Sequence, residues 1–406
     1  MDKPNRHISL GHVQIGDLEK QFVNEVLDSN RLSAGKYIHG FETEVAALHG
    51  CRYGIMCNSG ASALSIAIAA LKERGEWNED DEVIVPALTY ISVPNAIMQC
   101  GLQPVFVDVD PAYYTINPHG IKAKITRRTR AIIPAHLFGF PCLMGDIKSL
   151  AVEHNLSLIE DASQAMFAQY QQSPVGSFGD IACFSTDAGQ PLTTGVGGVI
   201  TTNDQAIAVI CRSLQSQGRD PIYLTIDDDD DLQDEARRRR IVERRFSYVR
   251  LGHSYRVTEL EGALGLAQLA DRDTMLRQRR ANAHWLNQKL SRFSECLQLP
   301  DTPPNCAPSW SFYPIVAKNG LDRAPVVDYL EAHGIETRFM LPLLNQPIYK
   351  KIFGNIENRF PVARGLSQNG FYIGCHQGLT REDLAYIVRR FEAFFAEYEK
   401  PPDDAA

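Results

Sequence analysis

The sequence predicts an α/β fold: a mostly parallel sheet sandwiched by helices, plus a smaller C-terminal α/β domain. Between Asp81 and Thr202, short β-branched runs alternate with stretches long enough for helices. The runs are apolar on both faces, which is typical of strands covered by helices on both sides. The length of 406 residues, 44% of them hydrophobic, suffices for one large domain and a smaller one.

Each element follows from its local pattern. An apolar helix is expected over 61–71, before the first run, and a second one over 258–269, where Leu and Ala recur at helical spacing. The six expected strands are residues 82–86, 104–109, 131–136, 156–161, 181–185 and 198–202. In parallel sheets ligands bind beyond the carboxyl ends of the strands. Candidate functional residues are therefore those that directly follow a run.

The chain divides into a large domain over 1–275 and a smaller domain over 276–400, with a frayed tail at 401–406. A charged helix after residue 270 is expected to link the two domains. Within the large domain, the segment 218–250 carries an acidic run, Asp227 to Asp231, followed by Arg237 to Arg240. Opposed charge blocks favour a solvated or partly mobile loop over a binding segment.

Composition excludes several classes of partner. Lys and Arg total 41 against 49 Asp and Glu, a net charge of −8, so no basic surface for nucleic acid or an anionic membrane is expected. No apolar stretch approaches the roughly 20 residues of a membrane span, and no secretory signal is visible at the start. The nine Cys form no C-x-x-C pair, which favours reduced thiols in a cytoplasmic protein over disulfides or a metal site.

A first cluster of interest is Asn58 to Leu64, a turn of small residues that opens the apolar helix. Free backbone N–H groups and a hydroxyl at a helix N-terminus form an anion site that suits a phosphate. An ordinary helix N-cap is the alternative interpretation.

A second cluster, Glu160 to Ala165, places Asp161 directly after an apolar strand. A carboxylate in so buried a setting needs a positive partner, and the protonated ring nitrogen of a cofactor would serve. A helix N-cap is again the alternative.

The third stretch, residues 183–198, completes a resemblance to a known family. Together with the first two clusters it resembles the DegT-type sugar aminotransferases, which belong to the fold-type I pyridoxal-phosphate enzymes. The likeness covers nearly the whole chain and includes the landmarks Leu32 to Gly35, Phe41-Glu42, Pro86 to Tyr90, Ala135 to Gly139, Leu251 to Arg256 and Ser309-Trp310.

The resemblance implies a role for each matching residue. The cofactor phosphate would be held by Gly60, Ala61, Ser62 and Ser185. Tyr90 would stack on the pyridine ring, Asp161 would pair with the ring nitrogen, and Gln164 would lie near the ring hydroxyl. The resemblance also implies a homodimer with shared active sites, in which the stretch around Ser254 reaches into the partner's site.

The departures from the family pattern bear on the chemistry. Gln190 stands at the position of the family's lysine, which forms a Schiff base with pyridoxal phosphate and then moves protons. A primary amide is neither nucleophilic nor basic near neutral pH, so ordinary lysine-dependent transamination should be absent or very slow. Val196 replaces a usual Glu, and Ser254 replaces an Asn that reaches the partner's cofactor phosphate.

Two C-terminal segments, 337–342 and 369–380, look more like the branch that contains the nucleotide-sugar 3-dehydratases. In that branch a histidine replaces the lysine, and pyridoxamine phosphate is held without a covalent bond. Another group must then move protons, and Asp187, His136 and His376 are the candidates, although a lone His is often structural.

Three hypotheses remain open. The first is an enzyme of nucleotide-sugar or amino-sugar biosynthesis that binds pyridoxal or pyridoxamine phosphate non-covalently and acts on a nucleotide-sugar or keto-sugar. The second is an inactive relative that partners or regulates an active homologue. The third is an aminotransferase carrying a deliberate Lys→Gln substitution at Gln190.

Overall fold

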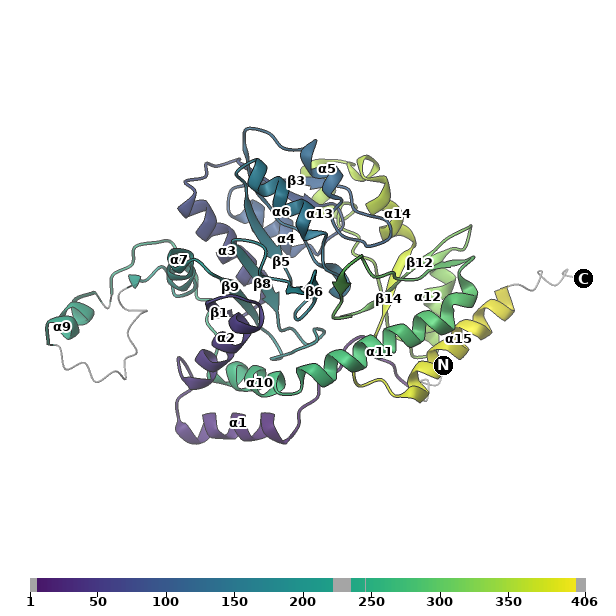
Figure 1. Ribbon diagram of the computed structural model, residues 1–406, viewed down its shortest axis with the longest axis horizontal. Helices are drawn as coiled ribbons and strands as arrows, with labels where there is room; N and C mark the ends of the chain where they lie inside the picture. Colours follow the sequence, from purple (N-terminus) through teal and green to yellow (C-terminus); the bar gives the residue numbers. More distant parts are fainter. Residues whose placement is uncertain (1–5, 222–234, 245, 399–406) are drawn as a thin grey trace, which may run out of the picture.

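A seven-stranded sheet forms the centre of the large domain in the computed structural model, which describes residues 6–221, 235–244 and 246–398 (Figure 1). The strand order is β1-β9-β8-β5-β4-β2-β3. β9 runs antiparallel to both its neighbours, and the other six strands share one direction. The strands are β1 (Tyr53–Cys57), β2 (Glu82–Pro86), β3 (Gln103–Val107), β4 (Thr129–Ile132), β5 (Ser157–Asp161), β8 (Ile181–Ser185) and β9 (Gly198–Thr202).

The predicted mostly parallel sheet is confirmed, and each of the six expected runs contains a strand. β4 is shorter than expected, although an isolated bridge between Ala135 and Asp161 continues its pairing with β5. β1 was not expected. It contains Gly54, where an added Cβ would lie 2.2 Å from the Glu42 carbonyl oxygen, so a side chain there would collide with the backbone of a neighbouring helix.

Helices cover both faces of this sheet. Ile55 and Cys57 of β1 share a core with α3, whereas Met56 between them shares another with α2. This alternation follows from the two-residue repeat of a strand. The helices of the large domain are α1 (Asp17–Ser29), α2 (Lys36–Leu48), α3 (Gly60–Arg74), α4 (Ser92–Gln99), α5 (Pro118–Lys122), η1 (Leu137–Gly139), α6 (Met144–Glu153), α7 (Gln205–Gln215), α9 (Glu235–Arg244) and α10 (Glu259–Leu269).

A second sheet, of order β10-β12-β14-β13, lies in the C-terminal part. α11 (Arg272–Leu290) runs from the large sheet to this part as the expected charged linking helix, and the predicted boundary at 275 falls within its first turn (Figure 1). The other elements of the C-terminal part are η2 (Ser291–Phe293), β10 (Leu297–Gln298), β12 (Tyr313–Ala317), α12 (Arg323–Ala332), β13 (Thr337–Phe339), α13 (Pro347–Phe353), η3 (Glu357–Arg359), α14 (Pro361–Asn369), β14 (Gly370–Ile373) and α15 (Arg381–Tyr398).

Two further pairings join the parts. The N-terminal Ile8 forms a parallel bridge with Ile335 of the C-terminal part. In a small sheet of order β11-β6-β7, β6 (Gln169–Tyr170) pairs with β11 (Cys306–Ala307) on one side and with β7 (Ser173–Pro174) on the other. The N-terminal segment and the segment that follows β5 therefore both contact the C-terminal part.

The charged segment is described only in part. The expected loop over 218–250 contains a helix, α9, which projects from the body at the left of Figure 1 and carries an exposed Arg239–Glu243 pair at 3.1 Å. The acidic run Asp227 to Asp231 and the tail 401–406 lie outside the described residues.

Candidate active site

The candidate site lies where the parallel strands end. β1, β5 and β8 share a direction, so their last residues, Cys57, Asp161 and Ser185, meet at one edge of the sheet. β9 begins at the same edge with Gly198, where an added Cβ would lie 2.5 Å from the Ser59 carbonyl oxygen and 2.6 Å from the Gly60 nitrogen. The lack of a side chain at Gly198 allows the turn after β1 to pack directly on β9.

That turn opens α3 and faces Ser185. Ser59 is the helix N-cap, and its Oγ accepts a hydrogen bond from the Ser62 backbone N–H at 3.0 Å. An added Cβ on Gly60 would lie 2.9 Å from the Ser185 Cβ, so the start of the helix packs against that side chain. Ala61, which follows, is exposed. Ser59 is therefore the residue that acts as the helix N-cap. The backbone N–H groups of the first helical turn lie at the same edge of the sheet as the Ser59 and Ser185 hydroxyls.

Asp161 is buried, with 5% of its surface exposed. Its Oδ1 accepts hydrogen bonds from the Ser163 backbone N–H at 3.1 Å and from the Ser163 hydroxyl at 2.6 Å. Burial raises the pKa of this carboxyl above its ordinary value. No helix begins in the turns over 162–168, so the helix N-cap interpretation of Asp161 is wrong. The nearby His136 partly offsets the rise in this pKa, and within the described part of the chain no Lys or Arg forms an ion pair with Asp161.

Gln164 and Tyr90 lie near the C-terminal part. The Gln164 Oε1 accepts a hydrogen bond from the Phe138 N–H at 2.8 Å, and its backbone carbonyl accepts one from the Ser311 hydroxyl. Tyr90 follows β2 and is 58% exposed. Burial raises the pKa of Tyr372 to about 12, and the nearby Tyr90 contributes to that rise. An exposed aromatic ring beside this edge is available to cover a ligand.

Gln190 lies on the loop that follows β8. Its backbone N–H donates to the Asp187 carbonyl at 2.9 Å, and its Oε1 is buried without a hydrogen-bond partner. The Asp187 side chain is exposed, and Val196 further along the loop is 56% exposed. An added Cβ on Gly11 would lie 3.1 Å from the Gly189 Cα, so the N-terminal segment packs on this turn.

Threonines and a glutamine hold the same loop, and the sequence analysis missed them. The Thr186 and Thr194 hydroxyl oxygens lie 2.7 Å apart. Gln268 of α10 accepts from the Thr193 N–H at 3.0 Å and donates to the Thr193 carbonyl at 2.6 Å. The run of threonines after β8 was the only signal, because the partner in α10 is 75 residues away.

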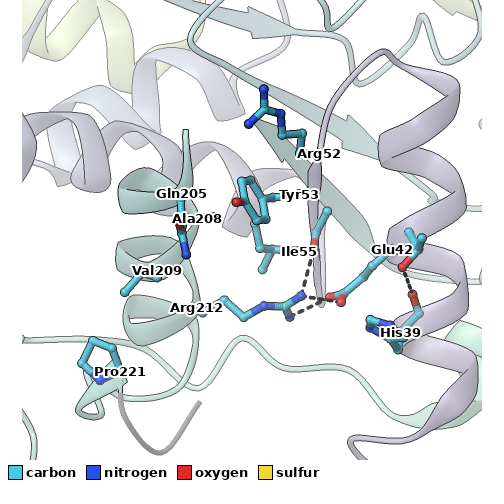
Figure 2. Close-up of a pocket in the computed structure, with 12 residues that line it drawn as sticks. His39, Glu42, Arg52, Tyr53, Ile55, Gln205, Ala208, Val209, Arg212 and Pro221 are labelled. Atoms are coloured by element: carbon cyan, nitrogen blue, oxygen red, sulfur yellow. Dashed lines mark hydrogen bonds and ion pairs between the residues drawn. The ribbon is translucent and has the colours of Figure 1, made fainter. Parts of the chain in front are cut away.

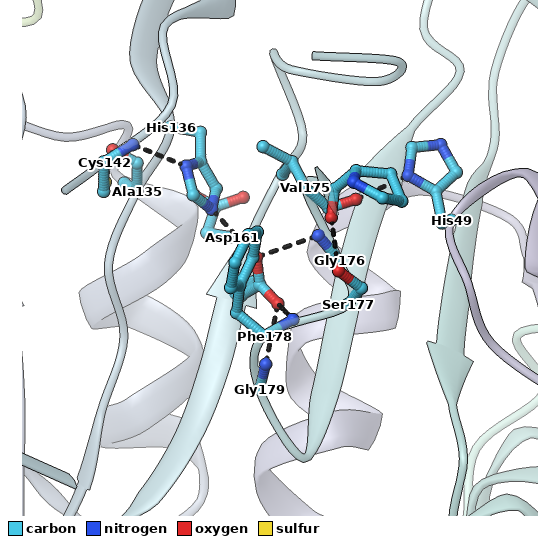
Figure 3. A network of polar contacts seen from close by, with 12 residues as sticks. His49, Ala135, His136, Cys142, Asp161, Val175, Gly176, Ser177, Phe178 and Gly179 are labelled. Carbon is cyan, nitrogen blue, oxygen red and sulfur yellow. Dashed lines mark hydrogen bonds and ion pairs between the residues drawn. The ribbon is translucent and has the colours of Figure 1, made fainter. Parts of the chain in front are cut away.

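His136, a candidate proton carrier, is fully engaged in the interior (Figure 3). Its Nδ1 accepts a hydrogen bond from the Cys142 N–H at 2.9 Å, so the ring proton is on Nε2, which lies 3.3 Å from a Glu160 carboxylate oxygen. Glu160 also accepts 2.8 Å hydrogen bonds from the Gly176, Phe178 and Gly179 N–H groups. This arrangement corresponds to the structural interpretation of His136.

Glu160 itself is an ionised carboxylate in the core. Burial alone would raise its pKa, but the hydrogen bonds from His136 and from the Gly176 and Gly179 backbone lower the pKa below its ordinary value. Glu160 and Asp161 are adjacent in β5, so their side chains point to opposite faces of the sheet. Glu160 thus accepts hydrogen bonds from several donors, whereas among the described residues only Ser163 donates to Asp161.

His376 contacts the N-terminal segment, and Ser254 pairs with Ser216 at the end of α7. Burial, with Arg279 and His12 adding to it, lowers the pKa of His376 to about 4, and its Nε2 lies 3.1 Å from the Ser9 carbonyl oxygen. Ser254 is exposed, and the carbonyl of the next residue, Tyr255, accepts from the Asn58 N–H at 2.9 Å. The Ser254 stretch therefore contacts the turn after β1 in its own chain.

A separate cavity of about 230 Å³ lies between α2, β1 and α7 (Figure 2). It is lined by the start of β1, including Tyr53, and thus lies away from the edge where the strands end. In its wall the Arg212 guanidinium pairs with Glu42 at 2.5 Å and donates to the Gly54 carbonyl at 2.9 Å. None of the predicted site residues lines this cavity.

The chain matches a known protein family over nearly its whole length. A model of the DegT/DnrJ/EryC1/StrS aminotransferase family matches residues 13–392. The chain belongs to this family. Like other members, it has the α/β fold of pyridoxal-phosphate-dependent aminotransferases, and the family's relatives act in nucleotide-sugar biosynthesis.

Several curated members of the family are similar over nearly the whole chain. A GDP-perosamine synthase of Caulobacter vibrioides is 34% identical over 94% of this chain and 96% of its own length. A dTDP-4-dehydro-2,6-dideoxy-D-glucose 3-dehydratase of Saccharopolyspora spinosa is 31% identical over 90% of this chain and 82% of its own. The similar family members thus include both a GDP-perosamine synthase and a 3-dehydratase.

Among solved structures, an E. coli GDP-4-keto-6-deoxy-D-mannose-3-dehydratase with bound hydrated PLP matches with a TM-score of 0.85 and 27% identity. The match covers 96% of this chain and 99% of the dehydratase. The aminotransferase TlmJ from Streptoalloteichus hindustanus has the same TM-score at 25% identity, over 97% and 100% of the two chains. The backbone alone therefore does not separate the two reaction types.

No described helix is long and apolar enough to cross a membrane.

Proposed function

We propose that this protein is a nucleotide-sugar biosynthetic enzyme that binds pyridoxal or pyridoxamine phosphate without a covalent bond and acts on a nucleotide-linked keto-sugar. The observation that carries the proposal is Asp161, a buried carboxyl with a raised pKa that forms no ion pair with a Lys or Arg among the described residues. A protonated pyridine nitrogen would supply the missing charge. The 3-dehydratase and perosamine synthase relatives support the substrate class.

The remaining residues fit the same group. Ser59, Gly60 and Ser185 provide a hydroxyl, a helix N-terminus and a second hydroxyl in one place, which suits a phosphate. Tyr90 would cover the ring, and Gln164, already held by the Phe138 N–H, would lie near the ring hydroxyl. The chemistry that this cofactor supplies when bound is the withdrawal of electrons from a carbon attached to its amino or aldehyde group.

Gln190 stands where we propose that other family members carry their lysine. Its amide can hold a ligand atom but can neither attack a carbonyl group nor take up a proton at neutral pH. Of the three candidate proton carriers, His136 is engaged at both ring nitrogens, and burial keeps His376 neutral beside Ser9. We therefore propose Asp187, whose side chain is exposed on the same loop as Gln190, as the group that moves protons.

A homodimer with shared active sites is part of the proposal. Leu251 is 98% exposed and Phe246 is 79% exposed, close to Ser254. Apolar side chains so fully exposed in one segment are typical of a protein–protein contact. The segment around Ser254 would complete the partner's site, as the family resemblance implies.

The experiment is a calorimetric titration of the dialysed protein with each vitamer, beside an Asp161→Asn variant. We expect the wild type to bind at least one vitamer and the variant to bind it at least tenfold more weakly. The loaded wild-type protein should then convert a GDP-linked 4-keto-6-deoxy sugar, followed by mass spectrometry. Binding without turnover of any keto-sugar would favour the inactive relative, and absence of binding would exclude the proposed enzyme.

A further inference from the structure

The side-chain amide of Gln190 has an unused acceptor at the candidate active site. Its Oε1 is buried, and no described residue forms a hydrogen bond with it. Burying an amide oxygen without a hydrogen-bond donor costs the free energy of removing it from water. Such atoms are therefore rare unless a ligand or a water molecule donates a hydrogen bond to them. The loop that carries Gln190 begins at Ser185, one of the proposed phosphate ligands.

The position of this residue is held by its surroundings. The Gln190 N–H bonds to the Asp187 carbonyl, Pro191 restricts the backbone after it, and Leu192 is 2% exposed. The Thr186–Thr194 contact closes the loop further along. An amide on a loop fixed at both ends can act as a directed hydrogen-bonding group, because little conformational entropy is lost when a ligand binds.

The Oε1 atom can accept a hydrogen bond but cannot donate one. Pyridoxamine phosphate carries a primary ammonium group, which donates strongly, whereas the aldehyde of pyridoxal phosphate has no donor. If the amide rotates and its NH₂ group binds the aldehyde oxygen, the bond is between two neutral groups and is roughly half as strong as a charge-assisted one. With Oε1 facing the ligand, the amine form therefore gains more from Gln190 than the aldehyde form gains with the amide rotated.

We propose that Gln190 selects the cofactor form: its Oε1 accepts a hydrogen bond from the ammonium group of pyridoxamine phosphate and makes the site prefer the amine over the aldehyde. This inference rests on the proposed function, because it requires a vitamer at this edge of the sheet. It assigns Gln190 a binding role that neither a lysine nor an apolar residue would fill.

The test compares the dissociation constants of both vitamers for the wild type and for Gln190→Leu, which keeps the approximate size but removes the amide. The wild type should bind pyridoxamine phosphate more tightly. In the variant, affinity for this form should fall by about tenfold or more, as expected for a hydrogen bond to a charged group, while affinity for pyridoxal phosphate stays within about twofold. The retained pyridoxal phosphate binding shows that the variant is folded.

Two further variants sharpen the result. Gln190→Glu keeps an acceptor and should keep the preference for the amine, whereas Asp161→Asn should weaken both vitamers alike. A wild type that prefers pyridoxal phosphate, or a Gln190→Leu variant whose two affinities change by the same factor, would overturn the inference and leave the proposed function standing. A wild type that binds neither vitamer would overturn both.

Discussion

At the scale of single residues, two adjacent carboxyls of β5 have opposite roles. Glu160 is satisfied by three backbone N–H groups and His136, so it stabilises the folded chain as an ion. Among the described residues only Ser163 donates hydrogen bonds to the Asp161 carboxyl, whose pKa is raised by burial. Residues held in a destabilised state are a common property of functional sites, where a ligand supplies the missing interaction.

The first prediction concerns Asp161→Asn in the cofactor-free protein. Asn can still accept from Ser163 but carries no charge, so the free energy of unfolding at pH 7 should rise by on the order of 1 kcal/mol. The gain should disappear below the ordinary pKa of 3.8, where the carboxyl is protonated in both states. It should grow as the pH rises from 3.8 to the folded pKa, because only the unfolded state has lost its proton in that window, and it should level off above the folded pKa.

Chemical denaturation of both proteins at pH 3.5 and pH 7 measures this difference. Asp328→Asn, at an exposed position of α12, is the matched control and should leave stability within about 0.5 kcal/mol at both pH values. A less stable Asp161→Asn variant at pH 7 would show that the carboxylate is already well paired in the free protein.

At the scale of elements, sequence patterns predicted the strands that are long and apolar and missed the others. The β-branched runs of β2 to β5, β8 and β9 stand out because helices cover both faces. β1 was missed because Gly54 weakens its pattern, and Gly is required there by the approach of the Glu42 backbone. The two-residue strands β6, β7 and β11 are too short to produce any periodicity.

The candidate site was predictable in the same uneven way. Asp161 was proposed because ligands bind at the ends of parallel strands, and Ser185 because the family resemblance implies it. The bonds that decide whether a polar residue is catalytic or structural join segments far apart in the sequence. The pairing of His136 with Glu160 spans 24 residues, and that of Thr193 with Gln268 spans 75, so neither leaves a local pattern.

The second prediction concerns the tie between α2, β1 and α7. Glu42 is 3% exposed and accepts from the Met56 N–H at 2.7 Å as well as from Arg212. In Glu42→Gln the Arg212 charge loses its partner, so the free energy of unfolding should fall by about 2 to 3 kcal/mol. Thermal unfolding compares it with Glu44→Gln, an exposed change on the same helix; equal melting temperatures for the two variants would contradict the assignment.

At the scale of the whole molecule, a buried histidine should make the fold sensitive to acid. His49 is fully buried, its Nδ1 lies 2.6 Å from the Val175 carbonyl, and its ring centroid is 4.2 Å from that of Phe184. Burial lowers its pKa from 6.5 to about 4. Between these values the unfolded chain binds a proton that the folded chain does not, so stability falls as the pH drops.

The third prediction is therefore a loss of about 3 kcal/mol of unfolding free energy from His49 alone between pH 6.5 and pH 4, at 1.36 kcal/mol per pKa unit. His49→Gln should be less stable at pH 7 but should show a flatter dependence on pH. Denaturation curves at half-unit intervals measure the slopes, with the exposed His119→Gln as control. An unchanged slope in His49→Gln would assign the acid sensitivity to other groups.

The assembly is the largest scale at which the proposed function makes a prediction. If the exposed segment around Leu251 contacts a second copy, Leu251→Asp places a charge in an apolar interface and should yield monomers at micromolar concentrations where the wild type is a dimer. Val152→Asp changes another exposed apolar residue, 75% exposed at the end of α6, and should remain dimeric. Light scattering after size exclusion gives the masses.

Because the sites would be shared, the Leu251→Asp monomer should also bind pyridoxamine phosphate more weakly than the dimer does. A monomeric variant with wild-type cofactor affinity would mean that each chain completes its own site. The contact between Asn58 and Tyr255 within one chain would then be enough to hold the Ser254 stretch at that site.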